Sequence, residues 1–161
     1  MKHKSFIVPH DFTSVANVAL DHAIETAKKA KTTIHILHVV NDEDEIDSAT
    51  DKIDEIIASK QVDGITLTNN VRIGNIFKSI SEFAVEHQSE LIFMGTHGAQ
   101  GWQHITGMNA LKVITHSTVP FIIVQERAVK PTGYDSIVVP MDLHKETKQK
   151  LSIVASLAKY F

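Results

Sequence analysis

The chain has 161 residues, 43% of them hydrophobic and 22% charged, which is enough for one domain with a hydrophobic core. Its formal charge of -3 gives no electrostatic basis for binding nucleic acid or an anionic membrane, and no apolar run approaches the ~18 residues of a membrane span. The absence of cysteine excludes disulfides, thiolate metal sites and cysteine nucleophiles.

The N-terminal region is basic, and the short apolar run Ser5 to Pro9 follows it. This run is too short for the core of a signal peptide, so we expect a cytoplasmic location.

Apolar runs alternate with helical patterns along the first 125 residues. The apolar runs predict strands at 6–8, 33–40, 65–68, 91–94 and 120–124, of which the third is weaker and is expected nearer an edge. The helical patterns predict helices from Ser14, as the N-cap, to about residue 31, and at 46–60, 76–84 and 109–116. This alternation predicts an α/β fold with an open parallel sheet and helices on both faces.

Two segments follow predicted strands at the edge where such folds bind ligands. They are Pro9-His10-Asp11 after the first strand and Gly95 to Gly98 after the fourth. Two interpretations of Asp11 remain open. It is either a turn residue or an N-cap shared with Thr13 or Ser14, or its carboxylate hydrogen-bonds a ribose or a base.

The fourth predicted strand leads directly into a glycine-rich segment. Gly95, Gly98 and Gly101 are spaced by two residues, and Gly107 precedes a helical pattern. Glycines let backbone N–H groups approach an anion, and a helix N-terminus adds partial positive charge. The spacing is neither the dinucleotide fingerprint nor a P-loop. Two readings therefore remain: a phosphate-binding loop, or a tight turn without a ligand.

The sequence offers little support for metal binding or for catalysis. Among the ten histidines, His35 and His38 lie three apart on a strand and so face opposite sides. No nucleophile elbow of the G-x-S-x-G type is present. We therefore expect no metal site and no enzyme activity, and any hydrolysis of ATP is expected to be slow.

The C-terminal region repeats the pattern of the N-terminal one. Residues 136–143 match residues 5–12 at serine, valine, proline and aspartate, in the same register. This repetition divides the chain into a domain at 1–125, a linker at 126–134 and a further segment at 135–161. One reading of the last segment is a single extra β-α unit. The other is the first strand and helix of a second domain, which would make the chain a piece of a tandem protein.

The combined motifs resemble the universal stress protein family (UspA-like) over about residues 4–125. The residues that carry the resemblance are Ile7 to Ser14, Leu37 to Val40, Leu91 to Gly98, Ala110 to Ile114 and Val119 to Val124. The resemblance implies an adenine nucleotide alpha hydrolase-like sheet with strand order 3-2-1-4-5. It also implies a stress-response role with ATP or AMP as the bound nucleotide. Members often associate through the last strand, here Pro120 to Val124, either as dimers or between two domains of one chain.

The resemblance also implies which residues would hold the nucleotide. They are Pro9, Asp11, Val39, Met94, Gly95, Gly98, Gly107, Met108 and Asn109. The chain departs from the family motif G-x2-G-x9-G-Ser/Thr in two ways. Eight residues separate Gly98 from Gly107, and Met108 replaces the hydroxyl residue. Loss of a hydroxyl bond to a charged group predicts binding weaker by roughly tenfold to a hundredfold. The alternative is a degenerate domain that binds no nucleotide and serves only in association.

Overall fold

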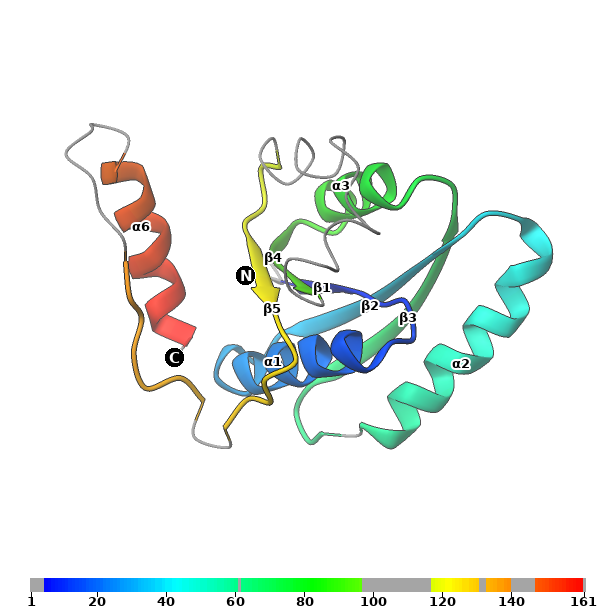
Figure 1. Ribbon diagram of the computed structural model, residues 1–161, viewed down its shortest axis with the longest axis horizontal. Helices are drawn as coiled ribbons and strands as arrows, with labels where there is room; N and C mark the ends of the chain where they lie inside the picture. Colours follow the sequence, from blue (N-terminus) through cyan, green and yellow to red (C-terminus); the bar gives the residue numbers. More distant parts are fainter. Residues whose placement is uncertain (1–4, 61, 97–116, 131–132, 140–146, 161) are drawn as a thin grey trace.

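A computed structural model describes residues 5–60, 62–96, 117–130, 133–139 and 147–160 (Figure 1). Its centre is a five-stranded parallel sheet with the strand order β3-β2-β1-β4-β5. The strands are β1 (Ser5–Pro9), β2 (Thr33–Val40), β3 (Thr66–Ile73), β4 (Ser89–Gly95) and β5 (Phe121–Val124). This order confirms the fold class and the sheet topology expected from the sequence.

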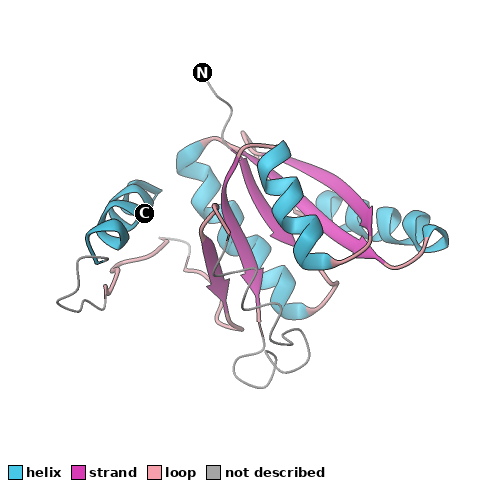
Figure 2. Cartoon of the chain, turned by 90° about the horizontal axis from the view of Figure 1, so that it is seen from above, coloured by secondary structure: helices cyan, strands magenta, loops and turns pink. Residues whose placement is uncertain are grey.

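Helices cover both faces of the sheet (Figure 2). Helices α1 (Ser14–Ala30) and α2 (Ile46–Ser59) lie on one face, and α3 (Ile76–Glu86) lies on the other. The strand residues alternate between the two cores: Phe6, Val8, Ile34, Ile36, Leu91 and Phe93 face α1 and α2, whereas Ile7, Leu37, Ile92 and Met94 face α3. Because both faces are covered, these strands are apolar throughout.

Helix α1 begins one residue earlier than the sequence pattern indicated. Thr13 is the N-cap, since its extended backbone precedes the helix and its side chain accepts a hydrogen bond from the N–H of Ala16. Ser14, the expected N-cap, is instead the first helical residue. At the other end the chain turns at Lys31, whose φ of 49° ends the helix in the left-handed region.

Strand β3 is much longer than the predicted strand at 65–68. It pairs with β2 over its whole length, from Thr33 opposite Thr66 to Val40 opposite Ile73. The polar residues in this strand obscured its pattern, but an edge strand tolerates them because one side is open. Asn69, for example, is satisfied by bonds from its amide to the carbonyl of Thr50 and the carboxylate of Asp54, at 2.9 and 2.8 Å.

The C-terminal segment runs beside the open edge of β5 (Figure 1). Residues 133–139 form neither strand nor helix, and Ile137 and Val138 are 42% and 87% exposed. Helix α6 (Thr147–Leu157) and the short helix η2 (Ala158–Tyr160) follow, and Leu157 packs against the core beneath α1. The division of the chain into domains remains a prediction. Within the described ranges, every helix is too short or too polar to traverse a bilayer.

Candidate functional site

The strand order places a topological switch point between β1 and β4. The chain moves outward from β1 through β2 to β3, and then returns to the other side of β1 as β4. All the strands are parallel, so their carboxyl ends meet at one edge, and ligands of such sheets bind there. The segments after Pro9 and Gly95 therefore flank the position that the sequence predicted for a ligand.

Asp11 holds the turn between β1 and α1. Its Oδ1 accepts hydrogen bonds from the N–H of Thr13 at 3.1 Å and from the Thr13 hydroxyl at 2.5 Å. This arrangement agrees with the first of the two interpretations of Asp11 made from the sequence, that of a turn residue. The carboxylate is nevertheless exposed, and both of these bonds use the same oxygen. The second oxygen, Oδ2, can accept hydrogen bonds from a ligand without disturbing the turn.

A cluster of His10, Phe12 and His38 lies under this turn, and no pattern in the sequence indicated it. His10 is buried, its Nδ1 accepts from the N–H of Phe12 at 3.1 Å, and burial lowers its pKa. Its carbonyl oxygen accepts from Nδ1 of His38 at 2.6 Å. Phe12 has a φ of 66°, which is strained for a bulky side chain, and its ring lies 4.3 Å from that of His38. The cluster fixes the position of the turn that carries Asp11.

Gly95 ends β4 in close contact with helix α1. A Cβ at this position would lie 2.5 Å from the carbonyl oxygen of Val15 and 3.0 Å from the nitrogen of Ala16. Packing against α1 therefore already requires glycine here, without a ligand. Of the other residues that the resemblance assigns to the nucleotide, Gly98, Gly107, Met108 and Asn109 lie outside the described residues.

Three of the expected site residues share one face of the carboxyl edge. Met94 belongs to the core beneath α3, and Val39 packs against that core. Pro9 lies two residues beyond Ile7, which belongs to the same core, so the strand alternation gives it the same face. The structure thus places Pro9, Val39 and Met94 on one face close to the switch point, where Pro9 and Met94 are buried and Val39 is half-buried.

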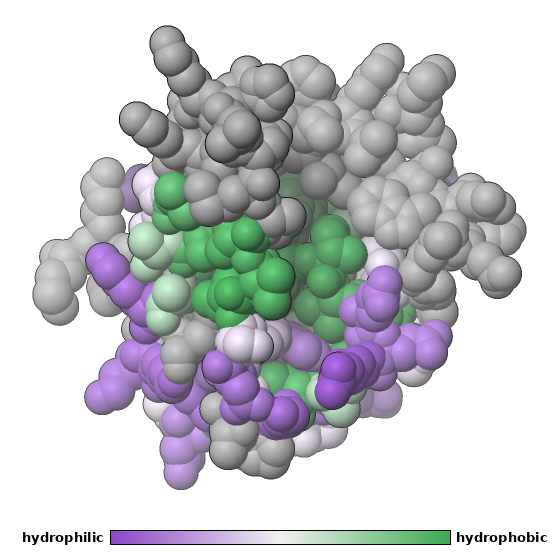
Figure 3. Space-filling model, turned by 60° about the vertical axis from the view of Figure 1, so that its left-hand side comes forward, coloured by the Kyte–Doolittle hydropathy of each residue, from purple (hydrophilic) through white to green (hydrophobic). Residues whose placement is uncertain are grey.

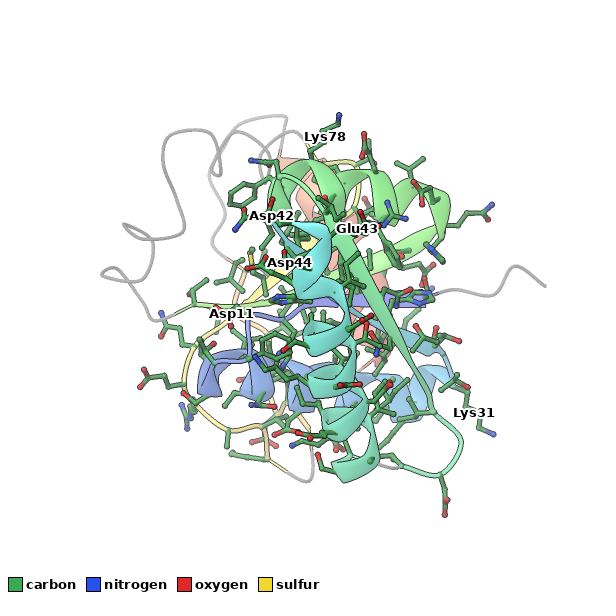
Figure 4. The ribbon with its side chains drawn as sticks, turned by 90° about the vertical axis from the view of Figure 1, so that its right-hand side faces the viewer. Asp11, Lys31, Asp42, Glu43, Asp44 and Lys78 are labelled. Atoms are coloured by element: carbon green, nitrogen blue, oxygen red, sulfur yellow. The ribbon has the colours of Figure 1, made fainter. Side chains whose placement is uncertain are left out.

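The same edge carries negative charge. Figure 4 shows Asp42, Glu43 and Asp44 in the connection after β2, whereas Lys31 lies at the far end of the molecule. These three carboxylates and Asp11 are all exposed, and three of the four belong to or adjoin the short helix η1 (Glu43–Glu45). Like charges at this edge oppose the binding of a highly charged anion.

Two cavities in the described part of the chain lie away from this edge. One, of about 420 Å³, separates α1 and β5 from residues 125–130 and 133–136 of the segment after β5. The other, of about 620 Å³, separates α6 from the amino ends of β1 and β4. Neither is lined by Pro9, Asp11, Val39 or Met94, and both are gaps between the C-terminal segment and the sheet domain. Among the described residues there is no group of three or more His, Cys, Asp or Glu side chains arranged to hold a metal.

The strand order and the helices on both faces define an α/β protein whose fold is adenine nucleotide alpha hydrolase-like. More particularly, the chain belongs to the universal stress protein family, which residues 2–125 match.

Curated relatives carry the same family name. Universal stress protein G of Salmonella typhimurium is 22% identical over 142 residues, which cover 76% of this chain and 99% of the relative. Universal stress protein MJ0531 of Methanocaldococcus jannaschii is 26% identical over 141 residues, which cover 77% of this chain and 83% of the relative.

Solved structures of universal stress proteins have the same fold. One from Archaeoglobus fulgidus, in complex with dAMP, superposes with a TM-score of 0.62 at 18% identity and covers 77% of this chain and 99% of its own. Another, in complex with cAMP, gives a TM-score of 0.62 at 14% identity, with 79% and 100% covered. A third, from Archaeoglobus fulgidus DSM 4304, is 29% identical with a TM-score of 0.61. The match covers 77% of this chain but only 44% of that one.

Proposed function

We propose that this protein binds an adenine nucleotide weakly at the carboxyl edge of the sheet, between the ends of β1 and β4, as part of a stress response. The observation that carries the proposal is the apolar cluster of Pro9, Val39 and Met94, of which Val39 is half-buried, together with the exposed carboxylate of Asp11 two residues beyond Pro9. Apolar surroundings suit a base, and a carboxylate oxygen suits the hydroxyl groups of a ribose. The relatives solved with dAMP and cAMP support this ligand class.

The charge of the edge favours a nucleotide with few phosphates. Asp11, Asp42, Glu43 and Asp44 are exposed at or near this edge and repel phosphate groups. Met108, in the family motif, offers no hydroxyl to a phosphate. We therefore propose AMP as a better ligand than ATP, and binding without turnover as the activity.

Calorimetric titration of the full chain with AMP and ATP tests the proposal. Asp11→Asn keeps an oxygen for the turn with Thr13 but replaces the second carboxylate oxygen by an N–H donor. This variant should weaken AMP binding about tenfold or more, because the bond from a ribose hydroxyl is lost. The matched control Asp42→Asn removes a charge from the same edge and should leave AMP affinity equal or slightly higher. Absence of any binding heat with the unchanged protein would overturn the proposal.

A substitution in the glycine motif tests whether the missing hydroxyl at position 108 weakens nucleotide binding. Met108→Ser restores the hydroxyl of the family motif, so it should tighten binding of ATP by roughly tenfold to a hundredfold. Equal affinities of this variant and the unchanged protein would contradict the assigned role of position 108.

A second candidate function is association through β5, with no ligand. β5 is an edge strand, and Ile123 on it is 36% exposed. Figure 3 shows apolar side chains grouped on the side of the molecule that carries β5 and the C-terminal segment. The exposed large apolar residues of that region are Ile123, Ile137, Val138, Leu151 and Ile153. The partner would be a second copy of the chain or a second domain, and the long Archaeoglobus fulgidus relative supports the latter.

Light scattering during size exclusion separates these functions. Ile123→Lys should shift any dimer toward the monomer, because it places a charge on the edge strand. Ile73→Lys is the matched control, since Ile73 is 50% exposed at the opposite edge of the sheet. A dimer that persists in Ile123→Lys would exclude β5 as the interface.

A further inference from the structure

We propose that His10 is a proton-sensitive positioning residue for the turn between β1 and α1, which carries Asp11. Its neutral ring holds the turn closed, and a proton on the ring opens it. The inference rests on the proposed function only for its effect on nucleotide affinity, where it adds regulation by acid to the same site.

The ring of His10 holds the turn through one hydrogen bond. Its Nδ1 accepts from the N–H of Phe12, two residues along the chain, at 3.1 Å. Asparagine and aspartate side chains make the same bond in Asx turns, and Asp11 makes it here to the N–H of Thr13. The bond from Phe12 to His10 spans Asp11, so it fixes the backbone on both sides of that carboxylate.

This bond also fixes the protonation state of the ring. Neutral imidazole has one donor and one acceptor, so an accepting Nδ1 places the hydrogen on Nε2. A second proton would have to bind Nδ1, where it would face the N–H of Phe12, and two donors cannot bond each other. His10 is only 2% exposed, and its Nε2 has no partner within the described part of the chain. The charged ring therefore does not fit the closed turn.

The backbone of Phe12 favours opening once the bond is lost. Its φ of 66° is unfavourable for a bulky side chain. The bond to Nδ1 holds it there, together with ring contacts to His10 and His38 at centroid distances of 5.7 and 4.3 Å. Loss of the bond removes one of these restraints, so the turn can relax, and Asp11 moves with it.

The groups around His10 set the pH at which the proton binds. Burial lowers the pKa of His10 below its ordinary value of 6.5. Asp11 in the turn and Asn17 on α1 raise this pKa by smaller amounts, and His38 on β2 lowers it. Lys52 on α2, 5.3 Å from the ring centre of the phenylalanine in the turn, adds a further positive charge to this region.

The sign of the effect follows from proton binding. The closed turn is stabilised fully above pH 6.5, and this stabilisation is lost as the pH falls, because the exposed ring of the open turn binds the proton first. With a pKa of 6.5 for the exposed ring, the open population should rise by up to about tenfold between pH 7.5 and 5.5. A nucleotide that requires the closed turn then binds less tightly.

NMR of the full chain between pH 7.5 and 5 tests the release of the turn. The amide signals of Phe12 and Thr13 should shift with the same midpoint as the His10 ring, below pH 6.5. His10→Asn keeps an acceptor for the N–H of Phe12 but cannot titrate, so its amides should not follow the pH. His10→Leu removes the acceptor and should show the open turn at every pH. His38→Asn, which removes the neighbouring histidine, is the matched control and should keep the shift.

Calorimetry at pH 7.5 and 5.5 tests the effect on AMP. The ratio of the two affinities should be about twofold to tenfold larger in the unchanged protein than in His10→Asn. The phosphate of AMP titrates near pH 6, and the comparison of the two proteins cancels this effect. His35, whose pKa is about 4, stays neutral at both pH values.

The outcomes separate this inference from the function beneath it. If the His10 ring does not titrate above pH 5, or titrates while the Phe12 amide stays unchanged, the inference is wrong and the proposed function stands. A pH response that persists in His10→Asn and disappears in His38→Asn would also overturn it. Equal affinity ratios in both proteins would exclude regulation of the site. If the amides follow His10 but AMP binds at neither pH, the proposed function fails and only the opening of the turn remains.

Discussion

Gly95 and Val15 approach so closely that a single added carbon atom would not fit between them. An ideal Cβ on Gly95 would lie 2.5 Å from the carbonyl oxygen of Val15, which belongs to the first turn of α1. Both partners are backbone, so neither can move away by changing a rotamer. The glycine that begins the family motif therefore also sets the distance between β4 and α1.

Gly95→Ala should lower the free energy of unfolding by about 1 to 3 kcal/mol, since overpacking forces the backbone to shift. Urea denaturation measures this loss. Gly64→Ala is the matched control, because Gly64 has a φ of +81° and an added Cβ there would have no atom within 4 Å, so alanine meets only conformational strain of about 1 kcal/mol. If Gly95→Ala were as stable as the unchanged protein, α1 and β4 could shift apart at little cost in free energy. Weaker nucleotide binding in Gly95→Ala would not by itself identify a phosphate contact.

A titratable layer between the sheet and α3 makes stability depend on pH. His35 on β2 bonds Thr68 of β3 through Nδ1 at 2.7 Å, and its ring lies 4.5 Å from that of His87. Burial, and secondarily the charge of His87, lowers the pKa of His35 from 6.5 to about 4. The neighbouring charges are Arg72, whose guanidinium lies 4.7 Å from the ring centre of Phe83, and Glu86, which pairs with Arg72.

The direction of the effect follows from proton binding. Between pH 6.5 and about 4 the unfolded chain holds a proton on His35 that the folded chain does not. The stability contributed by the neutral ring is therefore complete above about pH 6.5 and is lost as the pH falls toward 4. We expect a loss of about 1 to 2 kcal/mol, after allowing for screening by solvent at a half-buried ring.

Urea midpoints measured at pH 7 and pH 4.5 test this expectation. His35→Gln cannot titrate and should lose this part of the acid destabilisation, although its stability at pH 7 will be lower because ring contacts are lost. His35→Leu is a second variant that does not titrate and should show the same shallower dependence on pH. The same slope in both variants and in the unchanged protein would exclude His35 as the source.

The sequence predicted the sheet well because its central strands are buried on both faces. Runs such as Leu91 to Met94 are apolar throughout, and only a parallel sheet covered on two sides produces them in alternation with helices. The long edge strand β3 was underestimated because its second half carries Asn69, Asn70 and Arg72, which the open edge accommodates. The apolar pattern of a strand reflects the burial of its side chains, so the pattern is weaker in an edge strand whose side chains are partly exposed.

The candidate site was predictable only in part, and for a similar reason. Alternation along the strands correctly placed His35 and His38 on opposite faces, and it gives Pro9, Val39 and Met94 one face. The two roles of Asp11 could not be separated from the sequence, since turn formation and ligand binding favour the same residue type. The contact of Gly95 with Val15 joins segments 80 residues apart, and no local pattern records such an approach.

The start of α1 provides a direct test of a position at which the sequence pattern was wrong. Thr13 caps the helix through the N–H of Ala16 at 3.3 Å and donates to Asp11. Thr13→Ala should therefore cost about 0.5 to 2 kcal/mol of stability, whereas Ser14→Ala, at an exposed first helical position, should cost within about 0.5 kcal/mol. Thermal or urea unfolding of the two variants gives the comparison. A larger loss in Ser14→Ala would restore the N-cap expected from the sequence.

A buried histidine on α1 forms hydrogen bonds to the segment after β5. His22 is 8% exposed, its Nε2 lies 2.9 Å from the carbonyl oxygen of Arg127, and its Nδ1 bonds the hydroxyl of Tyr134. Because neutral imidazole has one donor and one acceptor, Nε2 donates to the carbonyl and Nδ1 accepts from the tyrosine. Burial of the Tyr134 hydroxyl raises its pKa, which keeps it a donor at neutral pH.

Tyr134→Phe should loosen this segment while the ring contact of 5.6 Å with His22 remains. Loss of one hydrogen bond worth about 1 kcal/mol should increase the open population, and hence tryptic cleavage after the exposed Arg127, by roughly fivefold. Asp135→Asn is the control, because it removes only the exposed pair of Asp135 with Lys130, which contributes little. Mass spectrometry of timed digests under native conditions measures both rates. Equal cleavage of Tyr134→Phe and the unchanged protein would show that the histidine does not hold the segment in place.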